Sequence, residues 1–146
     1  MPNVSSDELK QIEHLLYGLN YAVSLRLYGP SNSEQGLIET LKNLISEDCE
    51  LSGVLRTSSN EAKTVVTNCL LYKGDEGSKP LELDSKKAEI IKLLNNMLSS
   101  IGFENAEMVV AFGLRQGHPA YPVFWDFAYD IHVKDKRWIF VGCSSD

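Results

Sequence analysis

The sequence has no excess of basic residues, and this absence bears on the class of ligand that the protein can bind. Its 146 residues contain 14 lysines and arginines against 20 aspartates and glutamates, which gives a net charge of −6. Proteins whose main task is to bind nucleic acid usually present a basic surface to the phosphate backbone. The composition therefore argues against nucleic acid as the main partner.

Motifs that hold metals or phosphates are also missing. The three cysteines, Cys49, Cys69 and Cys143, lie far apart in the sequence, and none belongs to a Cys-x-x-Cys pair of the kind that binds zinc. The glycines within residues 113–117 are not followed by the lysine and the helix that a phosphate-binding loop requires. We expect no metal, no cofactor and three free thiols in a reducing compartment.

Long hydrophobic runs are absent as well. The apolar stretches are a few residues long, far short of the roughly 20 residues that span a bilayer. The first eight residues show no cationic region followed by an apolar run, which an export signal would have. We therefore expect a cytoplasmic protein with no membrane contact.

The apolar patterns that the sequence does contain predict helices up to about residue 102. Apolar residues recur at helical spacing in residues 9–27 and 37–45, and again in residues 62–70 and 90–101. Three Ser-x-x-Glu patterns, beginning at Ser5, Ser31 and Ser58, are typical of helix starts. We expect about four helices in residues 5–102, the first ending near residue 28 and the last capped by Asp84 or Ser85. Residues 46–57 are ambiguous and are consistent with a short helix.

The remainder, about residues 107–144, changes to a two-residue period and predicts strands. Residues 108–114 are mostly apolar, and residues 124–134 alternate between apolar and polar side chains. A turn at residues 135–136 would pair Val133 with Trp138 and Ile131 with Phe140 on one apolar face. The expected fold class is α+β, a single domain of residues 1–146 with a helical layer packed on a three-stranded antiparallel β-meander.

Two groups of polar residues are candidates for function. The first is the second face of the predicted meander, where Asp126, Asp130 and His132 alternate, with His118 in the preceding connection. A carboxylate beside an imidazole can serve acid–base chemistry, so a small enzyme using His118, Asp126 or His132 stays open as an alternative. The simpler interpretation is a solvated strand face, because no turn presents a nucleophile.

The second group is acidic. Carboxylates cluster in three places, and such surfaces can steer and hold a basic partner. The candidate partner-binding residues are Glu47, Asp48, Glu50, Asp75, Glu76, Asp126 and Asp130.

The small acidic chain without catalytic motifs, with its C-terminal meander of residues 124–133 and 138–146, resembles bacterial immunity proteins of contact-dependent and polymorphic toxin systems. The resemblance implies a monomeric, non-enzymatic inhibitor that binds a cognate basic toxin domain, often a nuclease, and blocks its active site. A secretion chaperone or adaptor stays open as a second alternative. That class would form a stable homodimer with an exposed apolar groove.

Overall fold

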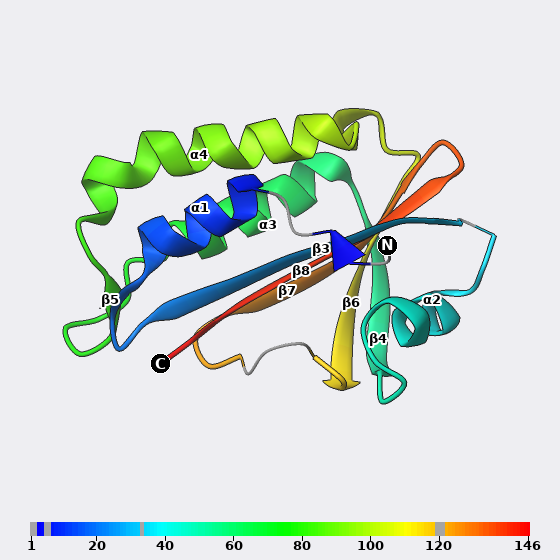
Figure 1. Cartoon of the computed structure of the whole chain (residues 1–146), viewed down its shortest axis with the longest axis horizontal. Helices are drawn as coiled ribbons and strands as arrows, with labels where there is room; N and C mark the ends of the chain where they lie inside the picture. The colour runs from blue at the N-terminus through cyan, green and yellow to red at the C-terminus, as the bar shows by residue number, and fades with distance from the viewer. Residues whose placement is uncertain (1–2, 5–6, 33, 119–121) are drawn as a thin grey trace.

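The fold is built on an antiparallel sheet of six strands in the order β1-β3-β8-β7-β6-β4 (Figure 1). The computed structural model describes residues 3–4, 7–32, 34–118 and 122–146. Two further short strands, β2 and β5, pair with each other beside the sheet. The strands are β1 (Asn3–Val4), β2 (Gly18–Leu19), β3 (Ala22–Asn32), β4 (Glu50–Thr57), β5 (Lys79–Pro80), β6 (Met108–Gln116), β7 (Asp126–Val133) and β8 (Lys136–Ser145).

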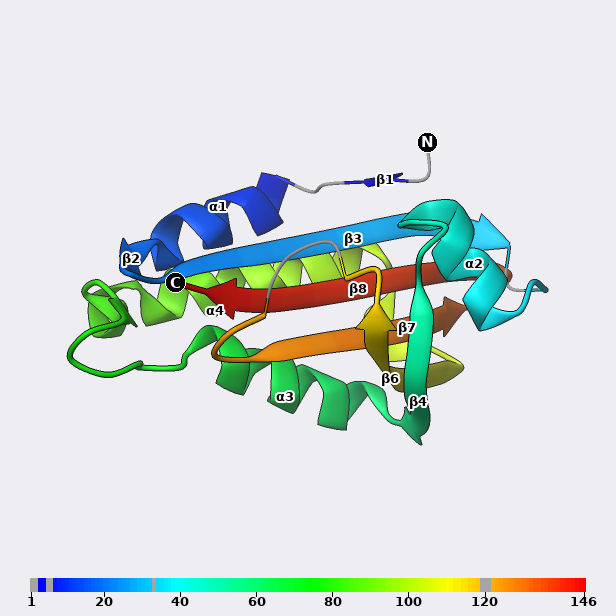
Figure 2. The same cartoon turned by 90° about the horizontal axis from the view of Figure 1, so that it is seen from below.

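Helices cover both faces of this sheet. Three of them, α1, α3 and α4, lie on one face, whereas α2 lies on the other face near one end (Figures 1 and 2). The helices are α1 (Asp7–Leu16), α2 (Leu37–Leu44), α3 (Ser59–Leu70), α4 (Leu83–Ser100) and the 3-10 turn η1 (Phe103–Asn105). None of the described helices is long and apolar enough to cross a membrane.

The main hydrophobic core lies between the three-helix layer and the sheet. Among the helices, α4 contributes the most buried residues to this core. Ile90, Leu94 and Met97 are among them, and they recur at the spacing of one helix face. The sheet contributes side chains that alternate along β7 and β8, among them Ile131 and Phe140. The apolar residues that recur at helical spacing and those that alternate along the strands therefore pack together in one core.

A second, smaller cluster lies under α2 on the opposite face of the sheet. Leu41 of α2 is fully buried there against Phe112, Ile139 and Val141. Both faces of the central strands are thus covered at this end. This is why β7 and β8 carry almost continuous runs of buried residues.

The prediction of a three-stranded meander is wrong, although the mixed α and β composition is confirmed. The main error lies in residues 17–28, where a helix was expected and the chain forms β2 and β3. The spacing of Leu16, Val23 and Leu27 fits a helix, but Val23, Leu25 and Leu27 also alternate, and these three are buried in β3. Gly18 lies within this segment, in β2, and pairs with Pro80 of β5.

A second difference concerns residues 46–57, where a short helix was expected and the chain forms a turn followed by strand β4 (Glu50–Thr57). Ser31 also does not begin a helix, because it belongs to β3, and α2 starts after Gly36. The pattern at Ser58 is confirmed, since its side chain accepts a hydrogen bond from the Glu61 amide at 3.1 Å. Ser5 lies outside the described residues.

The predicted C-terminal hairpin is confirmed with a shifted register. The turn comprises Lys134 and Asp135, so Ile131 lies opposite Trp138, and Phe140 lies opposite Tyr129. A shift by two positions keeps every side chain on its predicted face. The chain enters this hairpin through residues 116–122, a predicted connection that lies partly outside the described residues.

Strands β6 and β4 leave the plane of the other strands. Strand β6 pairs with β7 over Met108–Ala111, and its remaining residues pair with β4 alone. Figure 2 shows β6 and β4 turned steeply away from β3, β8 and β7. Strand β4 therefore forms an outer edge that projects from the body of the sheet.

Candidate functional site

The strand face that could have held an acid–base pair is buried beneath α2. Asp130 and His132 are 2% and 8% exposed, and Arg137 of the neighbouring strand is equally enclosed. Arg137 Nε lies 3.0 Å from Asp130 Oδ1, and its Nη2 lies 3.0 Å from His132 Nε2. His132 Nε2 also lies 3.2 Å from Asp130 Oδ2. These three side chains form a compact ionic cluster inside the fold.

This cluster fastens α2 to the sheet. Arg137 Nη1 donates to the carbonyl oxygen of Gln35 at 2.6 Å and to Thr40 Oγ1 at 2.7 Å. Both acceptors belong to the start of α2 or the residues leading into it. His132 Nε2 lies within hydrogen-bond distance of both the guanidinium and the Asp130 carboxylate, so the three side chains hold one another in place. The cluster thus has a structural task.

The interpretation of this face as solvated is wrong, because α2 covers Asp130 and His132. Asp130 is consequently not free to contact a partner, whereas Asp126, at the start of β7, is exposed. Asp126 and His132 lie six residues apart on one strand, roughly 20 Å, so they cannot act on one small substrate. His118 lies half-buried in the connection before β7.

The acidic residues Glu47, Asp48 and Glu50 are all exposed at the junction between α2 and β4. The turn that presents them is ordered by two hydrogen bonds, from the Cys49 amide to the Ser46 carbonyl and from the Asp48 amide to Ser46 Oγ. Glu50 Oε1 accepts from Arg115 Nη1 of β6 at 2.8 Å. Two of the three carboxylates, on Glu47 and Asp48, therefore stand in solvent without a cation fixed beside them in the described contacts.

Two further acidic residues, Glu34 and Glu39, belong to the same end of the molecule and were not among the predicted contacts. Both are exposed, one before α2 and one on it. Residues 34–50 contain five acidic residues and one basic residue, Lys42. We call residues 34–50 the acidic α2 end. Its carboxylates are spread along the sequence, so a search for adjacent acidic residues misses two of them.

The pair Asp75 and Glu76 lies elsewhere. It belongs to the loop between α3 and β5, which both views place at the end of the molecule opposite to α2 (Figures 1 and 2). Asp75 Oδ1 accepts from the amides of Gly77 and Ser78 at 2.8 and 2.9 Å, so this carboxylate orders its own turn. The three predicted acidic patches therefore do not form one surface.

Strand β4 presents an open edge beside the acidic α2 end. Within the described residues its one strand neighbour is β6, and both views place α2 on the side of β4 away from β6 (Figures 1 and 2). Its five residues 52–56 are all exposed, with Val54 at 59% and Leu55 at 72%. Exposed apolar side chains on an uncovered edge are unusual, because such edges invite pairing with another chain. We call residues 52–57 the open edge.

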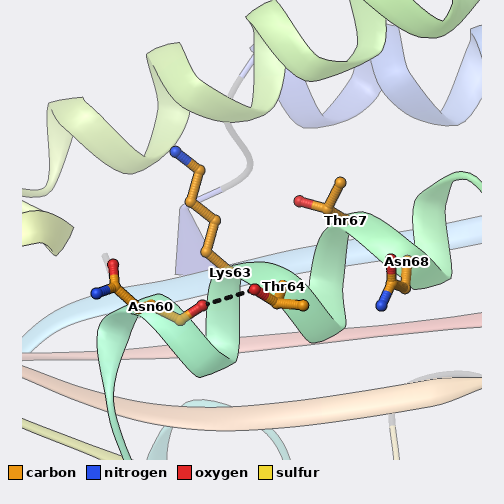
Figure 3. A pocket seen from close by; sticks show the side chains of 5 residues that line it. All are labelled: Asn60, Lys63, Thr64, Thr67 and Asn68. Atoms are coloured by element: carbon orange, nitrogen blue, oxygen red, sulfur yellow. Dashed lines mark hydrogen bonds between the residues drawn. The ribbon is translucent and has the colours of Figure 1, made fainter.

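A shallow hollow of about 410 Å³ lies along α3 (Figure 3). Its lining residues are Asn60, Lys63, Thr64, Thr67 and Asn68. All five come from one helix, and Thr64 Oγ1 donates to the Asn60 carbonyl oxygen within it. Their three- and four-residue spacing is that of the polar face of an amphipathic helix. Because no second element contributes a group, we do not assign a ligand to this hollow.

The cysteines are shielded from reaction. Burial is the main cause that raises the pKa of Cys143 to about 11, and the Asp126 carboxylate contributes to the same shift. Burial is also the main cause that raises the pKa of Cys69 to about 11. Cys69 is partly exposed, whereas Cys49 and Cys143 are buried. A thiol whose pKa is raised by burial is a poor nucleophile, so these residues suit packing better than catalysis.

Comparison with known proteins adds a likeness of fold. No protein-family model matches the chain, and no curated protein matches it. A crystal structure of MAF1 from citrus is similar, with a TM-score of 0.58 and 12% sequence identity over 94% of this chain and 98% of that one. At this identity the likeness concerns the arrangement of helices and strands. The chain shares the fold of that structure.

Proposed function

We propose that this protein is a stoichiometric inhibitor that captures a basic toxin domain, and that the acidic α2 end makes the contact. The observation that carries the proposal is the crowding of five exposed carboxylates against one lysine in residues 34–50. A toxin that cleaves nucleic acid must present cations to phosphates, so its cleft attracts such a surface. The resemblance to immunity proteins indicates the same class of partner.

The buried ionic cluster supports this role indirectly. By fastening α2 to the sheet, Arg137 holds the acidic α2 end in a fixed position relative to β4. A surface that is ordered before binding loses less conformational entropy on association. Preorganisation of this kind favours tight binding without any chemical step.

We expect the gene beside that for this chain to encode a large secreted protein with a basic C-terminal domain, and the test uses that domain. We expect the two purified proteins to form a 1:1 complex and the toxic activity of the domain to be lost at equimolar ratio. Inhibition that needs a large molar excess, or a domain that neither binds nor loses activity, would contradict the proposal.

A further inference from the structure

We propose that the partner binds by adding an extended, basic segment to the open edge of β4, so that the sheet of this protein continues into the partner. This inference rests on the proposed function and names the mode of contact. It starts from the geometry of an antiparallel edge strand. Alternate residues of β4 direct their amide and carbonyl groups away from β6, and these groups can pair with an incoming strand.

The regular part of the edge is long enough for such pairing. Bulges interrupt the register on the N-terminal side of Gly53, whereas Gly53 to Thr57 pair continuously with residues 109–113 of β6. An added strand would therefore run along these five residues. A Cβ atom on Gly53 would have no neighbour within 4 Å, so the face of the ladder is uncovered at this residue.

The side chains of the edge define what the incoming strand must carry. Val54 lies opposite Phe112, and Leu55 lies opposite Ala111, so the two exposed apolar side chains project to opposite faces of the ladder. An incoming strand can cover both if it has apolar residues on each face. The small surface of this pairing implies weak binding unless further contacts are added.

Charge identifies those further contacts. The acidic α2 end lies on the side of β4 where the added strand would run (Figures 1 and 2). It has five carboxylates and one lysine; the adjoining strands add two arginines, Arg56 of the edge and Arg115 of β6, and Arg115 already pairs with Glu50. A basic segment thus gains both main-chain hydrogen bonds and ion pairs, whereas an acidic segment is repelled. The edge and the carboxylates together fit a basic strand of a protein partner.

The experiment titrates the full-length 15N-labelled protein with the heptapeptide Lys-Lys-Val-Val-Val-Lys-Lys, which has valine on both faces of the strand, and follows amide shifts. We expect the largest shifts at residues 52–57. An analogue methylated at alternate backbone nitrogens, made in both frames, should bind at least about tenfold more weakly in one frame, because it loses the donors of the ladder. Glu47→Lys/Asp48→Lys should weaken binding, whereas the matched pair Asp75→Lys/Glu76→Lys, at the opposite end, should leave it unchanged.

The outcomes separate this inference from the proposed function. If both methylated analogues bind as well as the parent peptide, the strand-addition mode is wrong while capture of a basic partner stands. If the corresponding Glu-Val peptide binds equally well, the selection for basic partners is itself wrong. If residues 52–57 shift with protein concentration in the absence of peptide, the edge belongs to a second copy of this chain and the inference is overturned.

Discussion

Among single residues, Arg137 has the largest structural consequence. Its guanidinium joins two side chains of β7 to the start of α2, and it is 5% exposed. A buried ionic cluster is weak evidence for net stability, because desolvation offsets much of the attraction between its charges. Removing one member of the cluster should nevertheless destabilise the fold, since the remaining charges stay buried without a partner and are poorly solvated.

We therefore expect Arg137→Leu to lower the free energy of unfolding by about 3–5 kcal/mol, measured by urea denaturation. The control is Arg115→Leu, which removes an exposed ion pair to Glu50 and should cost less than about 1 kcal/mol. Equal losses for the two variants would show that the buried cluster contributes no more than a surface pair.

The buried thiols allow a prediction about alkaline pH. Because burial holds the pKa of Cys69 and Cys143 at about 11 in the folded state, above the ordinary value of 9, the unfolded chain loses these protons first. The free energy of unfolding should thus be unaffected by these groups below pH 9 and should fall as the pH rises from 9 towards 11. Denaturation at pH 8 and pH 10.5 measures the difference, and Cys69→Ala/Cys143→Ala should reduce it.

Reactivity offers an independent check on the same residues. At pH 8 native thiols of this kind carry little thiolate, so iodoacetamide should label the folded protein at least about tenfold more slowly than the urea-unfolded chain. Cys69 is the residue to watch, because it is partly exposed. Equal rates in the two states would contradict the assigned burial.

At the scale of elements, the pairing of β2 with β5 depends on the absence of one side chain. A Cβ atom on Gly18 would lie 2.1 Å from the Lys79 carbonyl oxygen, although the backbone angles of Gly18 suit any residue. We expect Gly18→Ala to cost about 1–3 kcal/mol through this clash. Gly53→Ala, where the same atom meets open space, should be neutral or slightly stabilising. Thermal unfolding of the two variants provides the comparison.

The sequence predicted those elements whose signals are local. The helix cap at Ser58 and the strand in residues 126–133 each depend on neighbours within a few positions, and both are confirmed. Strand β3 was missed because Val23 and Leu27 continue the helical spacing of Leu16, whereas Val23, Leu25 and Leu27 also satisfy a strand period. The partners of β3 decide between the two, and β8 lies more than a hundred residues away in the sequence.

In the candidate site, too, the sequence predicted the features that depend on local signals and missed those that depend on distant elements. Exposure of Glu47, Asp48 and Glu50 follows from their charge, and the structure agrees. The burial of Asp130 could not be foreseen, because the element that covers it, α2, crosses to the second face of the sheet. No spacing within β7 signals a helix on that face.

At the scale of the whole molecule, the uneven distribution of charge should govern how fast the partner is captured. Reversal of Glu47, Asp48 and Glu50 to lysine brings the net charge from −6 to zero, and so does reversal of Asp75, Glu76 and Glu82. We expect the first variant to lower the association rate and its salt dependence more than the second, because steering depends on charges near the contact. Stopped-flow binding at low and high salt measures both. Equal effects would mean that net charge alone sets the rate.

The position of β8 has a consequence for how the chain comes to be folded. This strand is the last in the sequence, yet it lies between β3 and β7 in the sheet. During synthesis, β3 therefore remains unpaired with β8 while more than a hundred further residues are made. Because this pairing joins strands so far apart in the sequence, it has a high contact order, which slows folding. Until β8 emerges, the unpaired edges of β3 and β7 and the apolar faces of the waiting helices are open to wrong partners. A nascent chain of this design depends on its final strand to close the sheet and remove that hazard.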